Sequence, residues 1–173
     1  MKNVIRFFLL LTLFIPISYA KIFSEISDAF DKRAVTPEGF ENAKLAVKLG
    51  EELASSEKDK NPEVAATAYL YSCRANYFLG DYLPVPRSEK KLAYEKGYLS
   101  CKKGMELLEL SRGKPKKEEW KNLLADLYFM YTGNFGRWFE DEGRFDALRY
   151  WKTEVQPILE ILAGEMKKDY IFG

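Results

Sequence analysis

Two arginines, Arg74 and Arg137, have the residue type and the sequence context expected of a ligand-binding pair. Each precedes a glycine by six residues, and an aromatic residue stands two positions beyond that glycine. A guanidinium group is a planar fork of N–H donors that can pair bidentately with a carboxylate. Such a pair above an aromatic floor would suit a peptide carboxylate or a small organic acid. The candidate binding residues are Arg74, Tyr77, Phe78, Arg137 and Trp138.

The residue types that are missing exclude most catalytic chemistry. The 173-residue chain has no histidine, so Ser-His-Asp and Cys-His nucleophile systems and imidazole zinc sites are ruled out. The densest acidic run, Glu140-Asp141-Glu142, is expected at a helix end, where carboxylates are normally solvated. We therefore expect a binding protein that is not an enzyme and that uses no cofactor or metal. Because 27 basic residues balance 26 acidic ones, we expect no nucleic-acid partner either.

Cys73 and Cys101 leave two alternatives open. They are predicted on neighbouring antiparallel helices, where an oxidising compartment would allow a disulfide. Counted from the turn at Gly80, they are offset by at least one helical turn, which places their Cα atoms near or beyond the ~7 Å limit for such a bond. The alternative is two buried thiols that act as small hydrophobic residues.

The first twenty residues have the layout of a secretory signal peptide. Lys2 and Arg6 provide a positive start, and a mainly apolar run covers residues 7–15. Ser18 and Ala20 place small residues three and one before the expected cleavage site. The run is shorter than the ~20 residues needed to span a bilayer, so we expect cleavage after Ala20 and no stable membrane insertion. The mature chain would be periplasmic or secreted.

The remaining residues, 21–173, are predicted to form a single all-α domain. Thr36-Pro37 and Asn61-Pro62 each pair a capping side chain with a proline at the first helical position. Apolar residues recur at helical spacing after each of these starts, and no stretch shows the alternation typical of a strand. Other helices are expected at about 22–30, 88–110, 118–142 and 145–162. Pro157 should kink or split the last of them.

Glycines and most aromatic residues on these helices are interpreted as packing material. Gly97 and Gly104 share one stripe, and Gly133 and Gly136 share another. Since glycine costs a helix about 1 kcal/mol relative to alanine, we expect a neighbouring helix to approach closely at such stripes. The aromatic residues expected mostly in the core are Tyr69, Tyr128, Phe135, Trp138, Phe139, Tyr150 and Trp151.

An internal repeat indicates which helical architecture to expect. The segments 72–82 and 135–145 align at an offset of 63 residues, close to two tetratricopeptide units of about 34 residues each. On these segments the chain resembles the tetratricopeptide repeat superfamily, and more narrowly the periplasmic T component of TRAP transporters. The first-helix tryptophan usual in such repeats and a lipoprotein cysteine are missing. The likeness is carried by Arg74–Gly80, Tyr77–Tyr82, Leu92–Gly97, Lys102–Leu107, Gly136–Trp138 and Lys168–Gly173.

The resemblance implies antiparallel helix hairpins stacked as a short solenoid or bundle, with the first helices lining a concave groove. Arg74 and Arg137 would occupy equivalent places in that groove. It also implies an envelope scaffold for a protein or peptide partner, associated with a transport complex and able to oligomerise. Two other interpretations stay open. Each arginine pairs with a nearby acid such as Glu140 or Asp141, or the aromatic core encloses a small organic acid or amphipathic ligand, as in a carrier.

Overall fold

The computed structural model describes residues 20–110, 118–140, 144–158 and 160. The predicted signal peptide, apart from Ala20, lies outside the described residues, as do Asp141 and the segment 168–173. Every regular element in the described ranges is helical, which confirms the predicted all-α fold. In the same ranges no helix is both long enough and apolar enough to cross a membrane.

The helices follow one another with short connections. An N-terminal helix covers residues 20–31. It is followed by α2 (Pro37–Glu57), α3 (Pro62–Tyr82), α4 (Arg87–Leu110), α5 (Glu118–Phe139), α6 (Arg144–Tyr150) and the π-helical turn η2 (Trp151–Val155). For α2 to α5 these bounds agree with the predicted ones to within a few residues. The last predicted helix, 145–162, begins one residue earlier, and its predicted end lies outside the described residues.

The predicted starts of α2 and α3 are confirmed by their capping bonds. The Gly39 N–H donates to Thr36 Oγ1 at 3.0 Å, and the Val64 N–H donates to Asn61 Oδ1 at 3.5 Å. A proline occupies the first turn of each helix, where its missing N–H removes no internal bond. A cap of this kind typically contributes about 1 kcal/mol.

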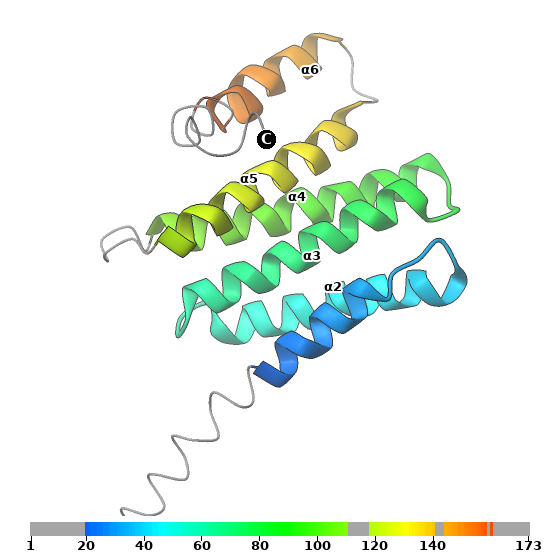
Figure 1. Ribbon diagram of the computed structural model, residues 1–173. Coiled ribbons are helices and arrows are strands. Elements are labelled where there is room, and N and C mark those ends of the chain that lie inside the picture. Colours follow the sequence, from blue (N-terminus) through cyan, green and yellow to red (C-terminus); the bar gives the residue numbers. More distant parts are fainter. Residues whose placement is uncertain (1–19, 111–117, 141–143, 159, 161–173) are drawn as a thin grey trace, which may run out of the picture.

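Successive helices run antiparallel and stack side by side (Figure 1). The central helix, α3, packs against α2, α4 and α5. Arg74 and Asp81 of α3 contact Asp126 and Arg137 of α5, respectively, so the contact points advance along both helices in the same direction. Therefore α3 and α5 are parallel neighbours, and α4 runs back between them. This is the stacked-hairpin arrangement predicted from the repeat.

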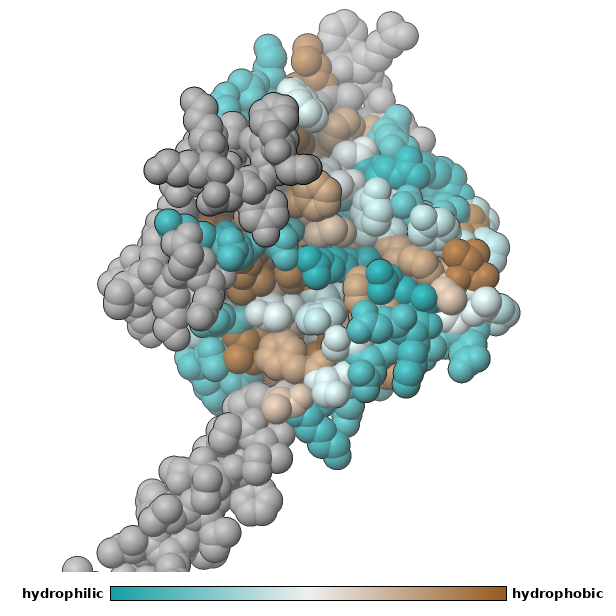
Figure 2. Space-filling view, viewed as in Figure 1, coloured by the Kyte–Doolittle hydropathy of each residue, from teal (hydrophilic) through white to brown (hydrophobic). Residues whose placement is uncertain are grey.

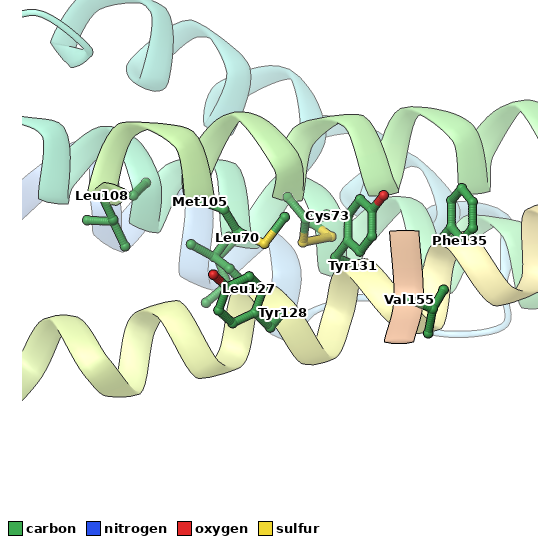
Figure 3. Packing of buried hydrophobic residues seen from close by; sticks show 11 residues of the cluster. Leu70, Cys73, Met105, Leu108, Leu127, Tyr128, Tyr131, Phe135 and Val155 are labelled. Atoms are coloured by element: carbon green, nitrogen blue, oxygen red, sulfur yellow. A yellow bond between two sulfur atoms is a disulfide. The ribbon is translucent and has the colours of Figure 1, made fainter. Parts of the chain in front are cut away.

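The largest apolar cluster lies between α3, α4 and α5 and surrounds a disulfide between Cys73 and Cys101 (Figure 3). The two Cα atoms are 5.5 Å apart, so the offset inferred from the turn at Gly80 was too large. Neither cysteine has exposed surface. Residues of all three helices enclose the bond, with buried contributions from Ala66, Leu70, Met105, Leu108, Leu127, Tyr128, Tyr131 and Phe135.

The glycine stripe of α4 is explained by the closeness of α5. A Cβ added to Gly104 would lie 2.9 Å from Leu127 Cδ2, and one added to Gly97 would overlap the Asn134 side chain. Close approach of a neighbouring helix was the predicted reason for these glycines, and it is confirmed. The stripe on α5 differs, because no heavy atom of the described part lies within 4 Å of a Cβ added to Gly136.

The chain after α5 departs from a regular helix just before Pro157. In η2 the Gln156 N–H donates to the carbonyl of Trp151, five residues earlier. Proline has no N–H, and its ring crowds the carbonyl four residues before it, so the irregularity predicted here takes the form of a wider helical turn. Trp151, expected in the core, is 44% exposed, which corrects that prediction.

Candidate functional site

Arg137 lies at the centre of an ion-pair network that joins α3, α4 and α5. Its Nε and Nη2 atoms donate to Asp81 Oδ1 at 3.2 and 2.9 Å, and its Nη1 atom donates to Glu140 Oε1 at 2.7 Å. Arg87, at the start of α4, donates to Glu140 Oε2 at 3.0 Å and to the Arg137 carbonyl at 3.2 Å. We call Asp81, Arg87, Tyr94, Arg137 and Glu140 the Asp81 cluster.

Tyr94 is the buried member of the Asp81 cluster. It has no exposed surface, and its hydroxyl donates to Asp81 Oδ1 at 2.6 Å. Burial and the bond to the Asp81 carboxylate raise the pKa of Tyr94 to about 12. The carboxylates of Glu140 and Asp81 raise the pKa of the Arg137 guanidinium above its ordinary value. The cluster is therefore a fixed set of charges with a neutral phenol at its base.

Arg74 forms a second, simpler link between α3 and α5. Its Nη2 atom donates to Asp126 Oδ2 at 2.9 Å, and both side chains are partly exposed. Asp81, which holds Arg137, lies seven residues beyond Arg74, about 10 Å along the helix axis. The two guanidinium groups therefore do not converge above one floor. Both arginines pair with acids, as in the alternative interpretation, and Arg137 does so in part with Glu140, one of the two acids named there.

The predicted aromatic residues divide between two places. Tyr77 faces Gly133 of α5 and lies 6.0 Å from Tyr94, measured between ring centroids. Burial, followed by the negative charge of Asp81, raises the pKa of the Tyr77 phenol. Phe78 packs on Tyr82, at 5.1 Å between ring centroids, and on Phe40. Tyr77 thus lies beside Tyr94 of the Asp81 cluster, whereas Phe78 packs toward α2.

Trp138 belongs to a different environment. Its ring contacts Tyr98, Phe135 and Tyr150 at centroid distances of 5.5, 5.6 and 5.9 Å, and Lys91 Nζ lies 5.1 Å from its centroid. Although it follows Arg137 directly, it packs with the apolar cluster of α4, α5 and α6. The structure therefore does not bring Trp138 together with Tyr77 and Phe78.

A strip of α5 between its two ionic links is open. Phe129 is 70% exposed, the largest exposure among the large hydrophobic residues of the described ranges. Gly133 and Gly136 follow at helical spacing, and only the edge of the Tyr77 ring comes near Gly133. We call Phe129, Gly133 and Gly136 the α5 strip. On the face seen in Figure 2, apolar patches are interspersed with hydrophilic residues.

Sequence reasoning missed Asp81, Arg87, Tyr94 and Asp126. A glycine at the end of a predicted helix, Gly80, was the signal that could have indicated a bulky neighbour, and the Tyr94 ring fills the space that Gly80 leaves. The acidic partners have no local signature, because Asp81 and Arg137 are 56 residues apart in the chain. Among the described residues, no three or more His, Cys, Asp or Glu side chains gather in a way that could hold a metal ion.

Comparison of the chain with protein-family models, with curated protein sequences and with solved structures yields no match. The site must therefore be interpreted from its own geometry.

Proposed function

We propose that this protein is an exported helical-repeat binding module that acts as an interaction scaffold in the cell envelope. Its partner is a protein or peptide, which it binds on the side of the bundle where α3 and α5 lie next to each other. The proposal describes a binding protein and assigns no reaction to it. The resemblance to the T component of TRAP transporters adds an association with a transport complex, and self-association, to the same proposal.

The observation that carries the proposal is the α5 strip between its two ionic links. Arg74–Asp126 and Arg137–Asp81 hold α3 and α5 together at two levels. Between those levels, an exposed Phe129 and two glycines leave the helix surface accessible. An exposed aromatic side chain with charged groups at its edges is the composition typical of a protein interface. Arg74 and Asp126 use one bond each in this pair, so both can also bind a partner.

A site-specific cross-linking experiment tests the proposal. A photoreactive amino acid replaces Phe129 in the full chain, expressed in cells that naturally make the protein. A second variant carries it in place of Leu45, a 44% exposed residue of α2. We expect a discrete cross-linked partner from position 129 and none from position 45, because only position 129 lies on the proposed face.

Two further substitutions connect the arginines to binding. Arg74→Ala and Arg137→Ala, placed in the position-129 background, should both lower the cross-linking yield while the far-UV circular dichroism stays unchanged. Unaltered yields in both variants would contradict a binding role for the arginines. Equal products from positions 129 and 45 would contradict the choice of face.

The second candidate is a carrier of a small organic acid or amphipathic ligand. A carrier needs an enclosed cavity of ~300 Å³ or more, whereas the aromatic rings between α4, α5 and α6 contact one another directly. Native mass spectrometry of the protein purified from its host separates the two proposals. A stoichiometric small molecule that leaves on denaturation, with no cross-linked partner, supports the carrier.

A further inference from the structure

The disulfide between α3 and α4 lies directly beneath α5. Asn134 of α5 places its Nδ2 atom 3.3 Å from both the carbonyl oxygen and the Sγ atom of Cys73. Leu127 and Tyr131, from the same face of α5, belong to the cluster around the sulfurs, and Tyr131 lies beside the bond in Figure 3. A third helix, which neither cysteine belongs to, thus covers the bond.

The cover is a close one. On α4, Gly97 stands one turn before Cys101, and its missing side chain is what allows Asn134 to fit there. Asn134 and both cysteines are fully buried. The Asn134 Oδ1 atom is also buried without a hydrogen-bond partner. Burying an unpaired polar atom costs free energy, so it lowers the stability of the docked position of α5.

Thiol–disulfide exchange requires access to a sulfur atom. A thiolate of a dithiol reductant attacks one cysteine sulfur and forms a mixed disulfide with it. The Cys73–Cys101 bond breaks, and the other cysteine leaves as a thiolate. The second reductant thiol then attacks the mixed disulfide, so that the reductant is oxidised to a cyclic disulfide and both cysteines are reduced. Neither attack has a path while Asn134, Leu127 and Tyr131 lie over the bond.

We propose that α5 is a removable cover that controls the access of dithiol reductants to the Cys73–Cys101 bond. A dithiol breaks the bond only when α5 has moved off the α3–α4 hairpin, and the docked helix protects it. Because α5 also carries Asp126, Phe129 and Arg137, a partner bound across α3 and α5 would keep the cover closed. That last consequence rests on the proposed function, whereas the covering itself does not.

The test measures how fast the folded full-length protein is reduced. Dithiothreitol is added under native conditions, samples are quenched with iodoacetamide, and the alkylated fraction is followed by mass spectrometry. Leu127→Ala loosens α5 against the disulfide cluster. The matched control is Leu53→Ala, because Leu53 is also a buried leucine, which packs from α2 against the N-terminal helix and α3. We expect at least a tenfold faster reduction in Leu127→Ala and less than a threefold change in Leu53→Ala.

Two results would overturn the proposal. Equal acceleration by both substitutions would mean that reduction follows global unfolding, and no acceleration by Leu127→Ala would mean that the sulfurs are reached without movement of α5. If either leucine variant fails to fold, two variants of partly exposed ion pairs are compared in its place. Arg137→Gln, which releases α5 from Asp81, should then speed reduction at least twofold, whereas Lys44→Gln, in an ion pair within α2, should not.

Discussion

The disulfide region and the Asp81 cluster both join α3 to α4 and α5, and they do so by opposite chemistry. Around Cys73 and Cys101 the contacts are covalent and mainly apolar, with the Asn134 amide as a polar exception, and the residues are buried. Around Asp81 they are charged and partly exposed, since Arg137 and Glu140 retain 40% and 42% of their side-chain surface. Burial makes the first region a source of stability, whereas the ion pairs of the second region contribute little free energy because solvent screens them.

The difference suggests a division of tasks along the bundle. A disulfide that closes a 28-residue separation stabilises the fold by about 3–4 kcal/mol in the chain-entropy account. A partly exposed ion pair contributes about 1 kcal/mol or less. If a partner's acid replaced Asp126 or Asp81 as the counter-ion of Arg74 or Arg137, the fold would lose little stability, because the covalent link keeps α3 and α4 in place.

The largest expected effect is the loss of the disulfide. The double variant Cys73→Ala/Cys101→Ala should lower the free energy of unfolding by about 3–4 kcal/mol, because the unfolded chain regains its freedom and the core loses two sulfur atoms. Urea denaturation followed by circular dichroism measures the change, with Lys44→Gln as a surface control. A loss below about 1 kcal/mol would show that the covalent link is not what stabilises this region.

A pair of glycine substitutions compares the closed and the open helix surfaces. Gly97→Ala should lower the free energy of unfolding by about 1–3 kcal/mol, because the new methyl group displaces the Asn134 amide. Gly136→Ala should raise it by about 0.5–1 kcal/mol, because alanine favours the helix and meets no described atom. Thermal denaturation of both variants gives the sign of each effect. The same sign in both would remove the distinction between the two stripes.

The smallest effect concerns Tyr94, the buried member of the Asp81 cluster. Its pKa is raised to about 12 in the folded protein and is near 10 when unfolded. Between these pH values the folded state holds the phenolic proton more tightly, so its stabilising contribution is complete below pH 10 and falls as the pH rises. Tyr94→Phe should remove roughly 1 kcal/mol at pH 8, and this difference from the parent protein should shrink between pH 10 and 12.

Urea denaturation across this pH range measures the contribution of Tyr94. Burial and the negative charge of the neighbouring Glu154 also raise the pKa of Tyr131. Because Tyr131 therefore also contributes to the pH dependence, the parent and Tyr94→Phe proteins must be compared at each pH. A constant difference from pH 8 to 12 would show that Tyr94 ionises alike in the folded and unfolded states.

The local structure could be predicted from the amino-acid sequence. Thr36 and Asn61 begin the two helices they were predicted to begin, because a capping side chain and a following proline act within one turn. The apolar periodicity likewise predicted the all-α fold, and the stripe of Gly97 and Gly104 predicted a close helix neighbour. Each of these rests on interactions between residues a few positions apart, or on one face of one helix.

The partners of the candidate site residues could not be predicted from the amino-acid sequence. Asp81 pairs with Arg137, which is 56 residues away in the chain. Asp126 pairs with Arg74, and Cys101 lies within disulfide distance of Cys73. Each of these depends on how far one helix slides along another, at 1.5 Å per residue. That register is set by the summed packing of many side chains, such as Leu127 against Gly104, and the spacing of single residues in the sequence does not contain it.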